Sequence, residues 1–299
     1  MPLSARNKET RQAAQRRRTA PTSRCRHKKP WASVCLVAAC CLLPVATFAE
    51  TPETVRRFSA AEARQGVAVD AAHAYVIDNR AIGKYDKRSG KLVARWRDRD
   101  GGPLVHMNSG TVVGGRLYCA HSNYPAIPAA SSIEIFSTDP LEHVDSHSFG
   151  LAPGSCTWVD RYNQCWWVLF AHYGGKQAVG GKDNRWTQLV RYDDQWRRTG
   201  GWVFPHGVLE RFGTHSCSGG SWGPDGLLYC TGHDAAEVYV LRLPRAGSTL
   251  EHLTTLEIPM HGQAIAWDRT TRRTLYGVDR PKKQVLACHP NEVLAKKTP

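Results

Sequence analysis

A loose internal repeat constrains this chain more than any other feature of its sequence. Between residues 65 and 288, a short apolar strand that begins with a small or amide residue is followed five times by a turn containing Asp or Gly. A second strand centred on an aromatic residue comes next, and the five centres are Tyr75, Tyr118, Trp167, Tyr229 and Tyr276. These centres lie 43, 49, 62 and 47 residues apart. That period is typical of four-stranded blades rather than of helical or leucine-rich repeats.

Four strands can be assigned to most of the repeated units. The first strands are expected at 65–70, 109–114, 155–160, 218–223 and 263–268, and the third strands at 81–85, 132–136, 188–192, 238–243 and 284–288. Fourth strands are expected at 92–96, 143–149, 201–204 and 252–258. The fifth unit lacks a fourth strand, whereas an unassigned strand at 54–58 precedes the first unit. We expect this N-terminal strand to complete the last blade and close a ring.

The sequence therefore predicts an all-β chain that folds as a β-propeller of five four-stranded blades. No segment keeps a period of 3.6 residues for more than two turns, which argues against long helices. Six or seven blades are the alternative, because the third interval is long enough to contain another sheet. The polar, Gly-rich stretch at 174–184 within that interval is more typical of a long loop.

Residues 1–49 have the outline of a signal peptide. A basic stretch at 6–29 runs into an uncharged segment whose apolar centre, 34–45, is too short for a membrane span. Small residues at 47–49 suggest cleavage before Glu50, which leaves residues 50–299 as a single secreted or periplasmic propeller domain. A lipoprotein anchor at Cys40 is the alternative.

The charge of the chain argues against nucleic acid as a partner. The formal net charge is +14, but the leader holds ten Lys and Arg residues and one Glu. The remaining 250 residues carry 30 basic and 25 acidic side chains, and no element concentrates Lys and Arg with aromatic residues. We expect a monomer that binds a small molecule and has no membrane contact once the leader is removed.

Six cysteines remain in the mature chain, and export to an oxidising compartment permits disulfides without requiring them. Cys156 with Cys165, and Cys217 with Cys230, flank predicted hairpin turns and are close enough in sequence to be bridged. Buried free thiols are the alternative.

Propeller topology predicts where chemistry would take place. The loops that enter each first strand and those that link second to third strands lie on the same rim of the central channel. Most histidines of the mature chain fall in these loops, together with several carboxylates and amides. Since loops on a rigid scaffold commonly carry function, we expect a site at this rim. The competing interpretation is that Asn, Asp and His merely satisfy turn backbones at strand ends.

Histidine is the side chain best suited to moving protons near neutral pH. The candidate catalytic residues are His121, His172, His233 and Asp234. The candidate substrate-binding residues are His106, Asn108, Asn123, Tyr173, Gln263 and Arg280.

No cofactor is required by this set, and metal ligands are left unassigned. Rim oxygens could hold a divalent cation of the calcium type: Glu134, Asp234, Asp279, Asn79, Asn108 and Asn123. The histidines could equally ligate zinc, although they are dispersed rather than paired in the sequence.

Several segments resemble secreted bacterial propellers related to gluconolactonase-like and muconate-cyclase-like proteins, some of which are labelled cycloisomerases. The resembling segments are 106–110, 117–125, 131–135, 166–173, 218–223 and 232–234. Gluconolactonase-like relatives imply a metal held by a Glu, Asn and Asp set. Muconate-cyclase-like relatives imply metal-free acid and base catalysis on an unsaturated diacid or a lactone. In that case Arg280 would hold a carboxylate and His121, His172 or His233 would transfer the proton.

Two functions follow as hypotheses. The first is a lactonase-like or cycloisomerase-like enzyme that acts on a small carboxylate or lactone through rim histidines. The second is a non-catalytic propeller that binds a glycan, a peptide or a protein partner through the same rim.

Overall fold

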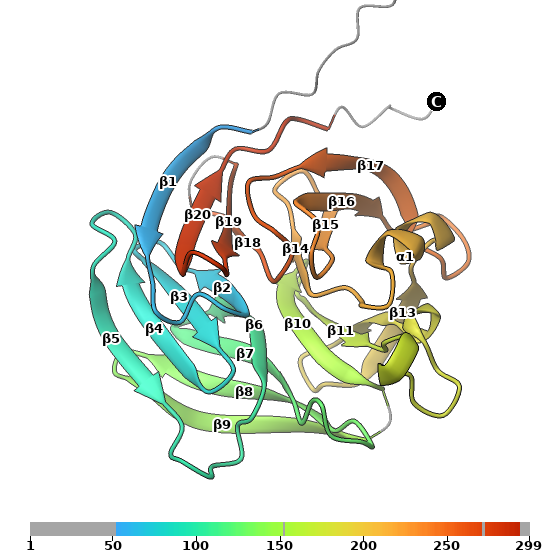
Figure 1. Ribbon diagram of the computed structural model, residues 1–299, viewed down its shortest axis with the longest axis horizontal. Coiled ribbons are helices and arrows are strands. Elements are labelled where there is room, and N and C mark those ends of the chain that lie inside the picture. The colour runs from blue at the N-terminus through green and yellow to red at the C-terminus, as the bar shows by residue number, and fades with distance from the viewer. Residues whose placement is uncertain (1–51, 152, 271–272, 294–299) are drawn as a thin grey trace, which may run out of the picture. The chain divides into compact units, whose positions relative to one another are not determined.

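The computed structural model describes residues 52–151, 153–270 and 273–293. Within these ranges the chain forms five antiparallel sheets of four strands each, arranged as blades around a channel (Figure 1). The prediction of an all-β, five-bladed propeller is therefore confirmed. The predicted signal peptide and its cleavage site lie outside the described residues.

Each of the first four blades is a meander of consecutive strands. The blades are β2 (Gly66–Val69), β3 (His73–Asp78), β4 (Ala81–Asp86) and β5 (Leu92–Arg97); β6 (Met107–Val113), β7 (Arg116–Ser122), β8 (Ser131–Thr138) and β9 (Leu141–Gly150); β10 (Ser155–Tyr162), β11 (Cys165–Ala171), β12 (Gln188–Tyr192) and β13 (Arg198–Val203); β14 (Gly219–Trp222), β15 (Leu228–Thr231), β16 (Glu237–Arg242) and β17 (Glu251–Glu257). The innermost strands β2, β6, β10 and β14 are mostly buried, whereas the outermost strand β5 alternates between exposed and half-buried residues.

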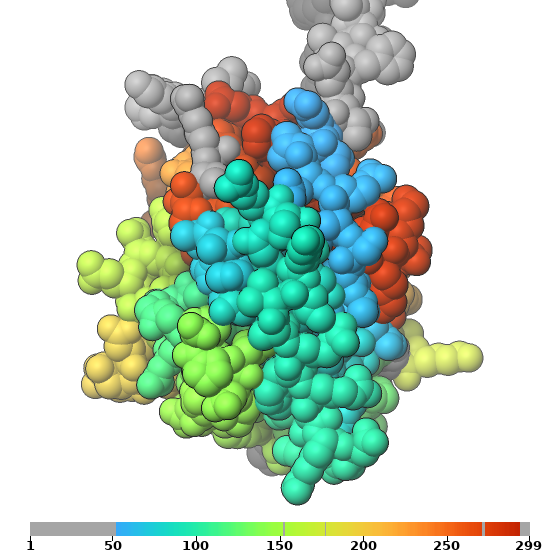
Figure 2. Space-filling view, turned by 90° about the vertical axis from the view of Figure 1, so that its left-hand side faces the viewer, coloured from blue at the N-terminus to red at the C-terminus, as the bar shows by residue number. Residues whose placement is uncertain are grey.

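The last blade is closed by the N-terminal strand. It contains β18 (Ala266–Asp268), β19 (Thr274–Asp279) and β20 (Gln284–Cys288), and its outermost strand is β1 (Thr54–Ser59). β1 pairs antiparallel with β20 from Thr54 opposite Cys288 to Ser59 opposite Gln284. Figure 2 shows β1 in blue at the side of the molecule, next to the teal first blade. The predicted closure of the ring is thus confirmed, and it ties the two ends of the domain together.

Close packing between blades holds the ring together. Trp158 in β10 is fully buried, and its indole lies so near Gly220 of the next blade that a Cβ there would come within 2.4 Å of it. Gly66 in β2 lies equally close to Ala264, because a Cβ added at Gly66 would lie 2.5 Å from the Cβ of Ala264. These glycines are required because the innermost strands converge on the channel and leave no room for a side chain.

The long third interval contains loops and a short helix instead of an extra blade. Two 3₁₀ turns, η1 (Gly175–Gln177) and η2 (Asn184–Trp186), lie between β11 and β12, and α1 (His206–Phe212) lies between β13 and β14. The Asn184 amide donates hydrogen bonds to the carbonyl oxygens of Leu209 (3.0 Å) and Gly213 (2.8 Å), so the loop and the helix are joined.

All six described cysteines are unpaired. Cys156 lies opposite Phe170 in the β10–β11 hairpin, whereas Cys165 lies opposite Tyr162 at its other end. Six residues of strand, about 20 Å, separate the two ends, which excludes a bridge between these cysteines. Cys217 and Cys230 are both buried as free thiols, and burial is the largest cause that raises the pKa of Cys230.

Among the described residues, no helix has the length and apolar character needed to cross a membrane.

Candidate active site

The propeller brings polar side chains from all five blades together at one mouth of its channel. Near the start of each innermost strand stands one hydrogen-bonding side chain, and the five are Gln65, Asn108, Thr157, Ser218 and Gln263. They line a pocket of about 500 Å³, which we call the channel pocket. Its remaining lining residues are Arg64, Asn79, Val105, His106, Tyr124, Pro125, Tyr173, His215, His233 and Arg280. This volume suits a small-molecule ligand.

Hydrogen bonds between elements fix the amides of this ring. The Gln65 amide donates to Asn79 Oδ1 (2.6 Å), the Asn108 amide to the Cys156 carbonyl (3.4 Å) and the Gln263 amide to the His233 carbonyl (3.2 Å). Since each amide uses an N–H in these contacts, its oxygen is left to accept a hydrogen bond from a ligand.

Two histidines that line the channel pocket share one aspartate. His215 precedes β14, and His233 and Asp234 follow β15. The Nδ1 atom of His233 lies 2.5 Å from Asp234 Oδ1, and that of His215 lies 3.1 Å from Asp234 Oδ2. The two imidazole rings stack with 4.1 Å between their centres and 16° between their planes. One carboxylate therefore orients both rings, and we call these three residues the His–Asp–His centre.

The pKa of Asp234 lies below its ordinary value. Desolvation acts to raise it, but the hydrogen bond from His233 and the nearby His215 outweigh that effect. A carboxylate that stays ionised accepts a hydrogen bond from each Nδ1–H, which leaves Nε2 of each ring as the proton acceptor.

A neighbouring turn holds His233 in place. Gln263 N–H donates to the carbonyl of Gly232 (3.1 Å), and Gly262 N–H donates to that of Ala235 (2.9 Å). Gly262 has a φ of +59°, and a Cβ added there would lie 2.1 Å from the His233 carbonyl oxygen. Only glycine fits this left-handed conformation at so close an approach.

Two arginines also line the channel pocket. Arg64 forms an ion pair with Asp78 at 3.7 Å, whereas Arg280 has no ion-pair partner among the residues that the structure describes. Burial, followed by repulsion from His121, Arg64 and Arg280, lowers the pKa of His106 to about 4. His106 is therefore neutral at pH 7, and Arg280 is the charge that an anionic ligand would meet.

Three rings form one wall of the pocket. The centre of the Tyr124 ring lies 5.0 Å from that of His106 and 5.2 Å from that of Tyr173. Burial raises the pKa of the Tyr173 phenol, so this group stays protonated and can donate a hydrogen bond.

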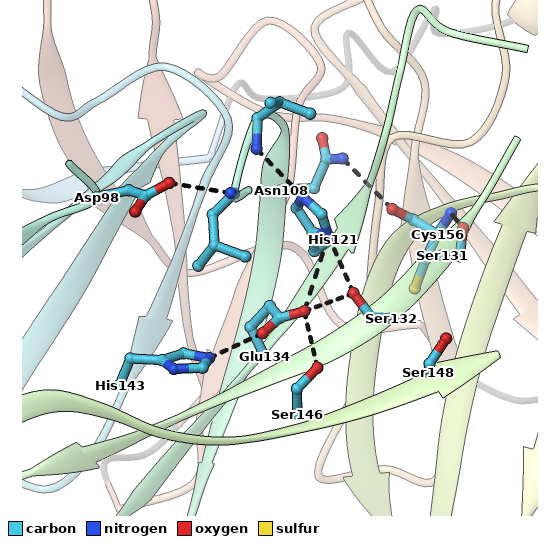
Figure 3. A network of polar contacts seen from close by, with 12 residues as sticks. Asp98, Asn108, His121, Ser131, Ser132, Glu134, His143, Ser146, Ser148 and Cys156 are labelled. Atoms are coloured by element: carbon cyan, nitrogen blue, oxygen red, sulfur yellow. Dashed lines mark hydrogen bonds and ion pairs between the residues drawn. The ribbon is translucent and has the colours of Figure 1, made fainter. Parts of the chain in front are cut away.

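His121 does not line the channel pocket. Figure 3 shows the network of polar contacts in which it lies instead. Its Nδ1 lies 2.9 Å from Ser132 Oγ, and its Nε2 accepts the Val105 N–H at 3.2 Å. Ser132 donates to Glu134 (2.5 Å), which also binds His143 Nε2 (2.8 Å). Burial is the main cause that lowers the pKa of His121, and both of its nitrogens are occupied. Its contacts cross-link the strands of the second blade.

His172 and Asn123 also lie away from the channel pocket. His172 Nε2 lies 3.1 Å from the Pro153 carbonyl, and burial lowers the pKa of this imidazole. Asn123 closes the loop between β7 and β8, because its amide donates to the Pro128 carbonyl (3.0 Å) and its Oδ1 accepts the Ala130 N–H (2.8 Å). Six of the sequence-based candidates do line the channel pocket: His233, His106, Asn108, Tyr173, Gln263 and Arg280.

No role was assigned from the sequence to His215, Arg64, Thr157 or Tyr124, and all four line the channel pocket. A usable signal exists for His215 and Arg64, since both lie within the four residues that precede a first strand of the repeat.

Among the described residues, the His–Asp–His centre is also a group that could hold a metal ion. One ligand atom from each of its residues lies within 4.8 Å of the other two. Two imidazoles and one carboxylate are a zinc-type rather than a calcium-type donor set. A metal bound through Nδ1 would first have to displace both hydrogen bonds to Asp234. The predicted calcium-type oxygens Glu134 and Asp279 do not line the pocket, and Asp279 forms an ion pair with Lys282 at 3.0 Å.

Paired charges occupy the opposite end of the channel. Asp160 binds Arg269 (2.6 Å), Ser221 Oγ (3.2 Å) and the Trp222 N–H (2.8 Å), and Lys87 binds Asp268 (2.5 Å). These groups satisfy one another and fasten neighbouring blades. Unlike the channel pocket, this end has no histidine among the described residues that line it.

Fold and site together define a five-bladed β-propeller with a polar, histidine-lined and arginine-lined pocket at one mouth of its channel. No family model matches the chain, and no curated protein matches it. In particular, no family match supports the resemblance to gluconolactonase-like or muconate-cyclase-like proteins.

Solved propeller structures are similar to this chain. One is the PQQ-bound aldose sugar dehydrogenase from Streptomyces coelicolor, with a TM-score of 0.51 and 10% identity over 81% of this chain and 98% of that one. Others are the Kuenenia stuttgartiensis hydrazine synthase (TM-score 0.43, 13% identity, 75% of this chain and 70% of that one) and the RRP9 WD40 repeats (0.43, 10%, 75% and 79%). At such identities the likeness shows the propeller fold alone.

Proposed function

We propose that the mature chain is an exported enzyme of the lactonase or cycloisomerase type that acts on a small carboxylate or lactone in the channel pocket. The observation that carries this proposal is that His215 and His233 share Asp234 in a pocket that also contains Arg280. A proton-transfer group and a charge that can hold a carboxylate therefore face the same space.

The His–Asp–His centre supplies both an acid and a base. The pKa of Asp234 is lowered, so its carboxylate is ionised near neutral pH. In the proposed mechanism one imidazole of the pair acts in its neutral form as the base, and the other acts in its protonated form as the acid. In lactone opening, the neutral imidazole takes a proton from water as the water oxygen bonds to the carbonyl carbon. The imidazolium returns a proton to the ring oxygen as its bond to that carbon breaks. Positioned acid and base groups of this kind accelerate a reaction by about 10²–10⁴-fold.

Arg280 anchors the carboxylate of the substrate. A guanidinium donates two parallel N–H bonds to a carboxylate, which fixes both the position and the orientation of the bound molecule. The amide oxygens of Gln65 and Gln263 can then accept hydrogen bonds from substrate hydroxyls. The lining of the channel pocket thus favours a head group with a carboxylate and further oxygens that can form hydrogen bonds.

The proposal requires no cofactor, and it describes a monomer whose partner is a small molecule. A divalent cation on the His–Asp–His centre would replace the neutral imidazole by a metal-bound water as the base. The chelation experiment in the Discussion separates the two cases.

The proposal is tested by screening the purified mature domain against aldonolactones, aryl lactones and unsaturated diacids in a pH-stat assay. The double variant His215→Gln/His233→Gln should lose at least 10²-fold in kcat on any substrate that the wild type turns over. His206→Gln on α1, an exposed histidine far from the pocket lining, is the matched control and should keep full activity. Saturable binding of these compounds without turnover would instead support the non-catalytic binding propeller. Full activity in the double variant would contradict the proposed mechanism.

A further inference from the structure

A second cavity adjoins the channel pocket on the same rim. Its volume is about 440 Å³, and it lies between the loop at 124–129, which links β7 to β8, and the loop at 176–182, which links β11 to β12. Leu151 and Ala171 add to its lining, which is mainly apolar. We call this cavity the apolar pocket.

Exposed hydrophobic side chains gather at the apolar pocket. Ile127, Leu151 and Val179 expose 66%, 61% and 38% of their surface, and all three line the cavity. Apolar side chains that remain in water around one concave site typically mark a place where a ligand covers them.

The two pockets are neighbours that share one wall. Tyr124, Pro125 and Tyr173 line both of them, and the two tyrosine rings lie 5.2 Å apart. A ligand whose head group is held by Arg280 therefore has an apolar cavity directly beside it, on the other side of these side chains. This adjacency favours a second part of the same ligand as the occupant of the apolar pocket.

The charges around the apolar pocket are positive. Lys176 and Lys182 line it, and neither has an ion-pair partner among the described residues. The Lys182 ammonium lies 5.5 Å from the centre of the Trp186 ring, while the nearby Asp183 is taken by Arg185 at 2.9 Å. These lysines favour an anionic ligand over a cationic one of the same length.

We propose that the apolar pocket binds an alkyl or aryl chain of the same substrate whose carboxylate or lactone occupies the channel pocket. The substrate is then an amphiphilic carboxylate or lactone rather than a fully hydroxylated sugar derivative. This inference rests on the proposed function for the chemistry of the head group only. Binding of a chain in the apolar pocket can be measured even if the protein does not turn the ligand over.

Isothermal titration with butanoate and octanoate, below the micellar range, tests the proposal directly. Each buried methylene contributes about 0.8 kcal/mol, so four additional methylenes should tighten binding on the order of 10²-fold. Octyltrimethylammonium, with the same chain and the opposite charge, should bind much more weakly than octanoate. Equal affinity for butanoate and octanoate would overturn the proposal.

Paired variants assign the effect to the apolar pocket. Val179→Asp should remove most of the gain from the longer chain, and Ile127→Asp, in the other loop, should do the same independently. The matched control is Val144→Asp, because Val144 on β9 is 48% exposed and does not line the cavity. If the control reduced the gain as strongly as Val179→Asp, the pocket would not be the binding site. A dimer in sedimentation that Val179→Asp dissociates would also overturn the proposal, by showing that a second copy covers the cavity.

Arg280→Gln separates this inference from the proposed function. The variant should weaken butanoate and octanoate by the same factor and leave their affinity ratio unchanged. A chain-length effect that persists when no lactone or diacid is turned over would refute the proposed function but support the apolar pocket. Turnover without any chain-length effect would do the reverse.

Discussion

The imidazole rings of His215 and His233 stack 4.1 Å apart although they belong to different loops of the fourth blade. Strand β14 begins just after the first histidine, and β15 ends just before the second. Because adjacent antiparallel strands run in opposite directions, the start of one meets the end of the next. The blade itself therefore brings the two rings to Asp234, and the site depends on this hairpin more than on any long-range contact.

Replacing Asp234 by Asn should reduce kcat by about 10²-fold while leaving thermal stability nearly unchanged. The amide no longer fixes both rings by accepting their N–H groups, so the general acid and base lose their orientation. Its side chain is 70% exposed, so little folding free energy depends on it. Steady-state kinetics and thermal melting provide the measurement. Glu142→Gln, an exposed charge change on β9, serves as the control, and an unaltered kcat in Asp234→Asn would show that the carboxylate has no role in proton transfer.

Replacing Arg280 by Gln should raise KM by about 10–100-fold and change kcat less. A charge-assisted hydrogen bond to a carboxylate is worth about 1.5–3 kcal/mol, which corresponds to that factor. Initial rates over a range of substrate concentrations separate the two constants. Arg116→Gln, at the exposed start of β7, is the matched control. An unaffected KM would mean that the substrate carboxylate is held elsewhere.

The fold could be predicted because strands in a meander leave a local signal. The predicted strands at 188–192 and 284–288 coincide with β12 and β20, and the closure by the N-terminal strand followed from counting strands. Helix α1 was not predicted, because its seven residues are too few to show a period. Its buried residues Val208, Leu209 and Phe212 acquire a partner only in the folded blade, where Phe212 packs against Tyr239.

The site was less predictable, because the repeat fixes the rim but not the direction of each side chain. His121 is the next-to-last residue of β7, and it lies directly opposite Ser132 of β8 in the register of the two strands. Its imidazole lies against the Ser132 hydroxyl instead of in the channel. A single sequence does not show which face of the sheet such a strand residue occupies. His233, by contrast, lies in the turn after β15, where side chains do not alternate between two faces. Its place at the rim could therefore be predicted from its position after the strand alone.

Replacing Gly262 by Ala should destabilise the domain and reduce kcat together. A Cβ at this position would lie 2.1 Å from the His233 carbonyl oxygen, so the turn that carries His233 must move. Gly247→Ala is a sharp control, because Gly247 also has a positive φ, +80°, but has no atom within 4 Å of an added Cβ. Both variants bear the cost of a left-handed alanine, about 1 kcal/mol, and only Gly262→Ala bears the clash. Chemical denaturation and kinetics on both variants would measure the difference. If the two behaved alike, the close contact would be irrelevant to the site.

Stability should fall as the pH decreases from about 6.5 towards 4, partly because of His106. Burial, and then repulsion from His121, Arg64 and Arg280, lower the pKa of His106 to about 4, whereas the unfolded chain keeps the ordinary value of 6.5. Between pH 6.5 and 4 the unfolded state therefore binds more protons than the folded state. The free energy of unfolding is highest above pH 6.5, where His106 is neutral in both states, and it falls as the pH drops through this window. The buried His121 and the partly buried His172, whose pKa values are also lowered, act in the same direction. His106→Gln should flatten the dependence of the melting temperature on pH between 7 and 4, compared with His252→Gln on the outer strand β17. An unchanged slope would show that His106 titrates normally in the folded protein.

Exhaustive removal of metal ions by a chelator should leave both activity and stability intact if the histidines of the His–Asp–His centre act as acid and base without a metal. Both Nδ1 atoms face oxygens of Asp234, at 2.5 and 3.1 Å, so neither histidine needs a metal to satisfy it. Dialysis against a chelator, followed by titration with Zn²⁺ and with Co²⁺, tests this expectation through kinetics and the visible spectrum of bound Co²⁺. Loss of activity on chelation and recovery with Zn²⁺, absent in Asp234→Asn, would instead make the same three side chains the ligands of a catalytic metal. In that case water bound to the metal, rather than an imidazole, would be the base.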